Sequence, residues 1–201
     1  MSMKFRASRY LEILGIAAAA LAVSGCQDLA ATWQPVAADD GLFFDMPAFR
    51  DVRPVRSAHQ DSARFTINHQ ASWTAGGGYP RGALSYYAAT AGTYFPQRAV
   101  VLGEKEIRST WNAAPGVEIG VYQQRTTSNS LGPNAHYAIF RLGGNVRCVA
   151  FVQYFGAIFA ADSTGVGNRM IQGYYCGMPG STMSDADAVQ VVRSFRVETR
   201  L

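Results

Sequence analysis

The chain has 201 residues, of which 48% are hydrophobic and 12% aromatic, so it is long enough to bury a substantial core. It carries 18 lysines and arginines against 14 acidic residues, a formal net charge of +4, and no run of basic residues concentrates this excess. A nucleic-acid-binding protein needs a basic patch or stripe, and the sequence does not support that class.

The N-terminal segment has the basic, apolar and small-residue parts of a secretory signal, in the usual order. Three basic residues lie within residues 4–9, residues 11–23 are apolar except for Glu12, and small residues then lead to Cys26. The apolar run is short for a membrane-spanning helix and suits a secretory signal. An ordinary signal peptide with a chance cysteine and an uncleaved membrane anchor are the alternatives.

The end of this segment, Val23-Ser24-Gly25-Cys26, resembles the lipobox of bacterial lipoproteins. The resemblance implies cleavage before Cys26 and lipidation of its thiol, with palmitate among the acyl chains. Such chains hold a protein stably, because each buried methylene contributes about 0.8 kcal/mol. We therefore expect a signal peptide over residues 1–25 and a lipid anchor at Cys26. Gln27 replaces the aspartate that favours inner-membrane retention in lipoproteins, which implies the outer membrane, facing the periplasm.

Residues 26–41 predict a lipidated flexible tether, because they are rich in alanine and have little periodicity. Trp33 either touches the lipid headgroups or docks on the folded part. Residues 42–201 are predicted to form a single α+β domain.

The start of that domain contains Pro47 and Pro54, which argue against a long regular element. Arg50, Arg53 and Arg56 follow at a spacing of three, but Pro54 interrupts a helical stripe. These arginines form either a solvated loop or an anion-binding cluster.

Alternating polar and apolar residues predict strands at 63–68 and 83–89. The glycine-rich residues 75–82 between them lack the Gly-Lys-Ser/Thr ending and following helix of a phosphate-binding loop, which indicates a surface loop. Residues 104–111 predict a short helix. Further strands are expected at 117–122, 135–142 and 145–155, with a polar loop over 126–134.

Gly143-Gly144 favours a two-residue hairpin between two of these strands. In that register Ile139 faces Cys148 and His136 faces Phe151. Residues 170–177 predict another strand, residues 184–195 a helix with Ser184 as its N-cap, and residues 196–198 a short last strand.

Three cysteines are present, and lipidation of Cys26 leaves Cys148 and Cys176. An even pair in an oxidising compartment is most simply a disulfide. Antiparallel pairing of residues 146–154 with 170–178 would place the two cysteines opposite each other.

Motifs that carry chemistry are missing from the sequence. There is no Gly-x-Ser-x-Gly or Ser-x-x-Lys sequence, and His59, His69 and His136 are scattered. We predict no catalytic residue, no metal site and no cofactor. The abundant aromatic residues favour strands buried on both faces, with an aromatic-lined groove for a hydrophobic ligand, a glycan or a partner protein as the alternative.

The last part of the chain, from Gly173 through Pro179-Gly180 to the Ser184-capped helix, resembles small uncharacterised secreted proteins of proteobacteria and implies no activity. The sequence as a whole predicts an α+β fold: a mainly antiparallel sheet, a C-terminal helix packed on one face, and one disulfide. The leading function is a non-catalytic binding or structural role, in contact with another envelope or membrane-complex protein. A periplasmic hydrolase acting on an envelope component and a carrier of small hydrophobic ligands are the alternatives.

Overall fold

A computed structural model describes most of the chain between Gln34 and Glu198. The described residues are 34–35, 41–61, 66–89, 95, 102–110, 119–143, 145–156 and 167–198. The signal peptide predicted over 1–25, Cys26, Trp33 and most of the tether predicted over 26–41 lie outside them.

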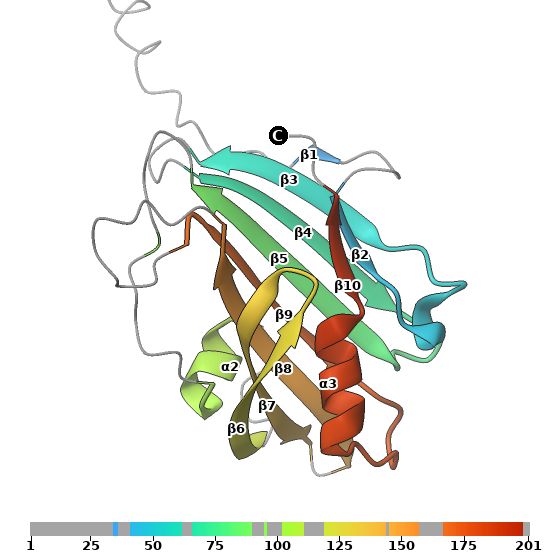
Figure 1. The fold of residues 1–201 in the computed structure, drawn as a ribbon. Coiled ribbons are helices and arrows are strands. Elements are labelled where there is room, and N and C mark those ends of the chain that lie inside the picture. Colours follow the sequence, from blue (N-terminus) through green and yellow to red (C-terminus); the bar gives the residue numbers. More distant parts are fainter. Residues whose placement is uncertain are drawn as a thin grey trace, which may run out of the picture. The chain divides into compact units, whose positions relative to one another are not determined.

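Eight strands form one antiparallel sheet in the order β1-β3-β4-β5-β9-β8-β7-β6 (Figure 1). The strands of this sheet are β1 Gln34–Pro35, β3 Val55–Asp61, β4 Thr66–Thr74, β5 Arg81–Ala89, β6 Ile119–Asn129, β7 Gly132–Leu142, β8 Val146–Phe155 and β9 Arg169–Cys176. Two successive meanders, β3-β4-β5 and β6-β7-β8-β9, meet where β9 pairs with β5. The predicted antiparallel sheet is therefore confirmed.

A second, two-stranded sheet joins β2 Gly41–Phe44 to β10 Phe195–Glu198. The helical elements are the 3₁₀ turn η1 Pro47–Phe49, α2 Glu104–Thr110 and α3 Asp185–Arg193. No helix among the described residues is long and apolar enough to cross a membrane.

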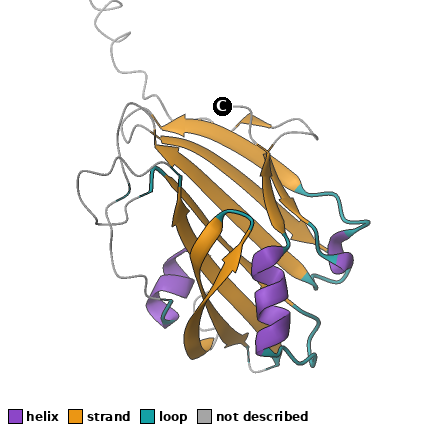
Figure 2. Cartoon of the chain, in the orientation of Figure 1, coloured by secondary structure: helices purple, strands orange, loops and turns teal. Residues whose placement is uncertain are grey.

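Helix α3 and the β2–β10 pair lie over one face of the large sheet (Figure 2). The larger apolar cluster joins residues of α3, β2 and β10 to residues of that face. Ala188, Val191 and Val192 of α3 are completely or almost completely buried there. Phe195 continues the contact, because its ring stacks on Phe151 of β8 at a centroid distance of 5.0 Å. The prediction of a C-terminal helix packed on one face is confirmed.

The opposite face is covered in part by α2. Ile107 of this helix packs with Phe140 of β7 and with Cys148 and Cys176. These cysteines form the predicted disulfide between directly opposed residues of β8 and β9, with their Cα atoms 4.1 Å apart. Strand β8 is buried on both faces over most of its length, and its sequence is therefore a nearly continuous apolar run.

A buried polar network fixes the tip of the β6–β7 hairpin near α3. Gln153 is completely buried, and its Nε2 donates to the carbonyl oxygens of Gly132 and Pro133 at 3.2 and 3.1 Å. Asn129 Nδ2 donates to Gln153 Oε1 at 2.7 Å and to the Val192 carbonyl at 3.2 Å. Each polar group of Gln153 therefore has a partner, which removes the penalty of burying it.

Two sequence predictions in this region are wrong. Leu142 pairs with Val146, so the connection holds three residues, and Phe140 rather than Ile139 lies opposite Cys148. Gly143 adopts a left-handed φ of 59°, which glycine tolerates in such a turn. The shift of one residue places His136 opposite Val152, on the other face from Phe151.

The polar loop predicted over 126–134 is also wrong, because β6 continues to Asn129 and β7 begins at Gly132. β6 lies at the edge of the sheet, and its residues 124–126 are exposed. Strand residues exposed in this way show no apolar alternation. Strand β3, on the other side of the sheet, is half-buried and largely polar, so it also lacks an apolar alternation and was not predicted.

Helix α3 begins with a capping box. The Ser184 backbone N–H donates to Asp187 Oδ2 at 2.8 Å, and the Asp187 N–H donates to Ser184 Oγ at 3.2 Å. The backbone hydrogen bond from Ser184, followed by the bond from its hydroxyl, lowers the pKa of Asp187 below its ordinary value. The predicted N-cap at Ser184 is confirmed.

Replacement of Asp187 should therefore have an effect that depends on pH. A depressed carboxyl pKa in the folded state stabilises the protein above the unfolded pKa of about 3.9, and this stabilisation is lost as the pH falls through the folded pKa. We predict that Asp187→Asn lowers the free energy of unfolding at neutral pH and that the difference shrinks in acid. Urea unfolding at neutral and acidic pH measures this, with the exposed Asp51→Asn as control. If the difference in the free energy of unfolding between the wild type and Asp187→Asn is the same at neutral and acidic pH, the Asp187 carboxylate is not stabilised by its hydrogen bonds to Ser184.

Gly173 lies where β9 pairs with β5, and its position leaves no room for a side chain. A Cβ there would lie 2.6 Å from the Ala83 carbonyl oxygen and 2.7 Å from the Phe151 ring. We predict that Gly173→Ala lowers the free energy of unfolding by about 1–3 kcal/mol, as overpacking does. Gly76→Ala is the matched control in urea unfolding, because nothing lies within 4 Å of its added Cβ. Equal effects of the two variants would show that the β5–β9 junction is not tightly packed.

Candidate binding pocket

A pocket of about 430 Å³ opens between the β2–η1 segment and the first strands of the large sheet. Its lining consists of Phe43, Phe44, Asp45, Met46, Pro47, Phe49, Arg50, Val52, Pro54, Arg56 and Trp73. The chain leaves β2, turns through η1 and returns as β3, so residues from both sides of this turn line one pocket. Trp73 comes from β4, the neighbour of β3 in the sheet.

The floor is aromatic. Phe44, Phe49 and Trp73 are each at most 5% exposed. The Phe49 ring stacks on Trp73 at 6.0 Å, and the Phe44 ring meets Trp73 edge to face at 5.7 Å. Tyr175 of β9 contacts both phenylalanines edge to face. Such pairs favour fixed ring positions, so the floor is preformed.

Gly82 of β5 lets this floor approach the sheet. A Cβ at Gly82 would lie 3.0 Å from the Phe44 ring, 3.0 Å from the Tyr174 carbonyl oxygen and 3.1 Å from the Phe49 ring. Gly82 is paired with Tyr175 in the sheet, so β5 and β9 together support the floor.

Two guanidinium groups lie against Phe43 at the rim. The Arg56 guanidinium lies 4.5 Å from the centroid of the Phe43 ring, and that of Arg196 lies 5.2 Å from it. Arg56 Nε donates to the Leu42 carbonyl at 3.1 Å, which fixes the plane of its guanidinium. Burial lowers the pKa of Arg56, but an arginine stays charged at any ordinary pH.

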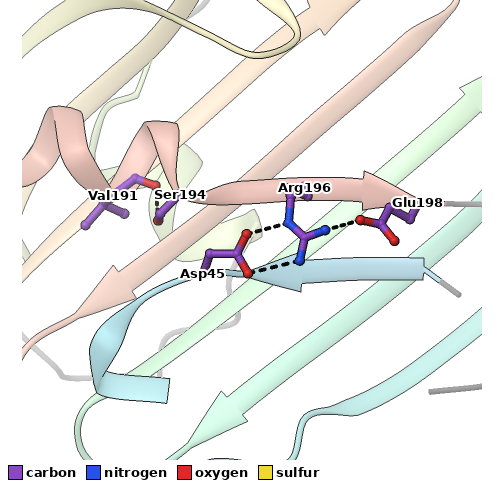
Figure 3. A network of polar contacts seen from close by, with 5 residues as sticks. All are labelled: Asp45, Val191, Ser194, Arg196 and Glu198. Carbon is purple, nitrogen blue, oxygen red and sulfur yellow. Dashed lines mark hydrogen bonds and ion pairs between the residues drawn. The ribbon is translucent and has the colours of Figure 1, made fainter. Parts of the chain in front are cut away.

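Asp45, the acid in the lining, is engaged by Arg196 (Figure 3). Arg196 donates to both carboxylate oxygens of Asp45 and also to Glu198. Donation to Asp45 raises the pKa of Arg196. The Asp45 N–H donates to the Ser194 carbonyl at 2.6 Å, which ties the end of β2 to the start of β10. These half-exposed charges contribute little to stability, about 0–1 kcal/mol per pair, so their effect is to orient Asp45 and neutralise it.

The three arginines singled out by their spacing are thus separated by the structure. Arg50 and Arg56 line the pocket, and Arg53 does not. Arg56 belongs to β3, and Arg50 is exposed just after η1. The lining therefore holds two arginines and one acid, Asp45, which is paired to Arg196.

The histidines are not brought together. His59 and His69 lie on adjacent strands but point to opposite faces, because His59 pairs with Asn68 and His69 with Ala58. His136 is half-buried on β7, and burial lowers its pKa. Within the described part of the chain, no three His, Cys, Asp or Glu side chains lie close enough to hold a metal ion.

No sequence motif predicts the pocket. Of the abundant aromatic residues, Tyr86 and Phe151 are completely buried in the core, whereas Tyr87, Tyr154 and Tyr174 are half-buried. The sequence does contain one signal for the pocket: Phe43, Phe44 and Phe49 lie close in sequence to the three arginines at 50, 53 and 56. Trp73 could not be added to that group, because its contact with them depends on the fold.

No protein family, curated protein or solved structure matches the chain. The chemistry of the pocket therefore rests on its own residues. The side chains that a ligand can reach include the exposed Pro47 and Arg50 and the half-buried Phe43, Val52 and Arg56, above a floor of buried rings.

The floor can be tested through Trp73. The chain has three tryptophans, so Trp33→Phe with Trp111→Phe leaves Trp73 as the reporter. We predict weak acrylamide quenching of its fluorescence, because the Trp73 side chain is 3% exposed. Phe49→Leu should increase the quenching at a cost of about 1 kcal/mol of stability, a typical value for one substitution. The exposed Met178→Leu should leave it unchanged; strong quenching in the parent variant would mean that the floor is open.

Proposed function

We propose that the chain is a lipid-anchored protein of the bacterial cell envelope whose folded part binds another envelope or membrane-complex protein. In this proposal residues 1–25 are a signal peptide and Cys26 carries the lipid. The tether spans 26–41, residues 42–201 form one α+β domain, and the protein faces the periplasm from the outer membrane.

The pocket at β2, η1 and β3 is the observation that carries the binding role. It is preformed, its floor is apolar, and its rim has a defined charge. Recognition sites commonly combine an apolar surface with a few placed polar groups in this way.

The envelope location is supported by two features. The N-terminal order of charged, apolar and small residues ends in the lipobox-like Val23-Ser24-Gly25-Cys26. The Cys148–Cys176 disulfide is of the kind that forms and persists in oxidising compartments such as the periplasm.

A second candidate function, the carrying of a small hydrophobic ligand, is favoured by the volume of the pocket. A volume of about 430 Å³ falls within the roughly 300–1,000 Å³ of typical small-ligand sites. The open position of the pocket, with exposed Arg50 and Pro47 in its lining, favours a protein partner.

Cys26→Ala tests the anchor. We predict that the variant leaves the membrane fraction, because the acyl chains have lost their attachment site. Fractionation and immunoblotting measure this, with total protein blotted as the control for degradation. Unchanged membrane retention would overturn the lipid anchor.

Co-purification tests the partner. The wild-type protein, solubilised in mild detergent and affinity-purified, should carry with it a stable envelope protein identified by mass spectrometry. Recovery of the monomer alone would contradict the binding role, whatever the outcome for Cys26→Ala.

A further inference from the structure

We infer that Arg81 and its neighbours form a binding site for a carboxylate group, on the face of the large sheet opposite to the pocket. Gly82 and Tyr175 lie against the floor of the pocket, so the residues before them, Arg81 and Tyr174, point to the other face. The site is therefore separate from the pocket, and its ligand is a second one beside the proposed partner.

The glycine-rich loop that joins β4 to β5 positions the first aromatic side chain of this site. The Gly78 N–H donates to the Ala75 carbonyl at 3.0 Å, and Gly77 and Gly78 have left-handed φ angles of 83° and 87°, which glycine tolerates. The chain then returns toward β5 with the ring of Tyr79 against Arg81. The guanidinium carbon lies 4.8 Å from the centroid of that ring.

Tyr174 of β9 is the second aromatic neighbour of Arg81. Tyr174 and Tyr79 both pack on the apolar cluster that contains the disulfide and Ile107 of α2. Burial raises the pKa of the Tyr174 hydroxyl above its ordinary value, and the charge of Arg81 opposes this rise. Arg81 therefore lies close to both tyrosines, at the margin of an apolar cluster.

Arg81 is a cation without a counter-ion. Its side chain is half-buried, and no carboxylate pairs with it among the residues that the structure describes. Its Nε is buried without an acceptor, whereas its terminal nitrogens are not among the buried atoms that lack one, so a ligand can reach them. Taking a charge out of water costs free energy unless an opposite charge compensates it. A bound anion would offset this cost.

A carboxylate matches this site in charge and in shape. A guanidinium group is planar, and its parallel N–H groups fit the two oxygens of one carboxylate. Thr74 lies directly opposite Arg81 in the β4–β5 register and is exposed, so its hydroxyl can donate to the same anion. The single charge of Arg81 suits a carboxylate better than a phosphate monoester, which carries almost two charges at neutral pH.

The experiment follows the N–H signals of residue 81 by NMR, in the full mature protein in zwitterionic nanodiscs at constant ionic strength. The probes are N-acetylglycine, its neutral amide and dimethyl phosphate. We expect N-acetylglycine to shift the signals saturably and to bind at least about tenfold more tightly than the amide, because the amide lacks the charge-assisted hydrogen bonds. Binding of the amide with equal affinity, or no saturable shift, would overturn the site. Equally tight binding of dimethyl phosphate would replace the carboxylate by a phosphodiester.

Arg81→Gln should weaken binding of N-acetylglycine at least about tenfold, because the charged donor is removed. The matched control is Arg53→Gln, which removes an equal charge from an exposed arginine outside the site and should weaken binding less than about twofold. Equal losses in the two variants would show attraction by the overall charge and overturn the site.

Two further variants keep the test independent of folding in Arg81→Gln. Arg81→Lys retains the charge but not the planar pair of donors, and Thr74→Val removes the hydroxyl. Each should weaken binding of N-acetylglycine about three- to tenfold, the effect of one lost hydrogen bond to a charged group. Unchanged binding in both variants would contradict the site. Neither outcome bears on co-purification of a partner through the pocket on the opposite face.

Discussion

The position of β9 between β5 and β8 is the constraint on which the rest of the structure depends. The disulfide holds Cys176 opposite Cys148 on one face, and Tyr175, the preceding residue, therefore points to the other face. There Tyr175 contacts Phe44 and Phe49, which form the floor of the pocket. Gly173, two residues earlier, lets Phe151 approach β9 and stack on Phe195. One strand thus joins the two meanders, the disulfide and the site.

The pocket also depends on how the second, two-stranded sheet is held. β10 follows α3 directly, and its pairing with β2 places Arg196 opposite Phe43. The same arginine binds Asp45 (Figure 3). The capping box at Ser184 and the burial of Ala188 and Val192 fix α3, and through it the β10 strand. The surface ion pair contributes little free energy, but it holds the Asp45 carboxylate against Arg196.

Local sequence signals predicted much of the fold. Alternation located most of β5, β8 and β9, the serine followed by Asp187 located the start of α3, and the cysteine pair predicted both the disulfide and the β8–β9 register. The β7–β8 register was missed, since a Gly-Gly pair fits both two- and three-residue connections. Strand β3 and the second half of β6 were missed because their largely polar residues carry no apolar pattern. The pocket could not be predicted, because Phe44 and Trp73 meet only through tertiary packing. Lipidation at Cys26 stays a prediction.

The central claim, that a partner binds in this pocket, is tested most directly by site-specific photocross-linking in the membrane-bound protein. A diazirine analogue of methionine at Met46, which lines the pocket, is compared with the same group at Met178, which is exposed elsewhere. We predict an adduct at Met46 to a segment of another envelope protein, and no such adduct at Met178. The same adducts at both positions, or none at Met46, would contradict it.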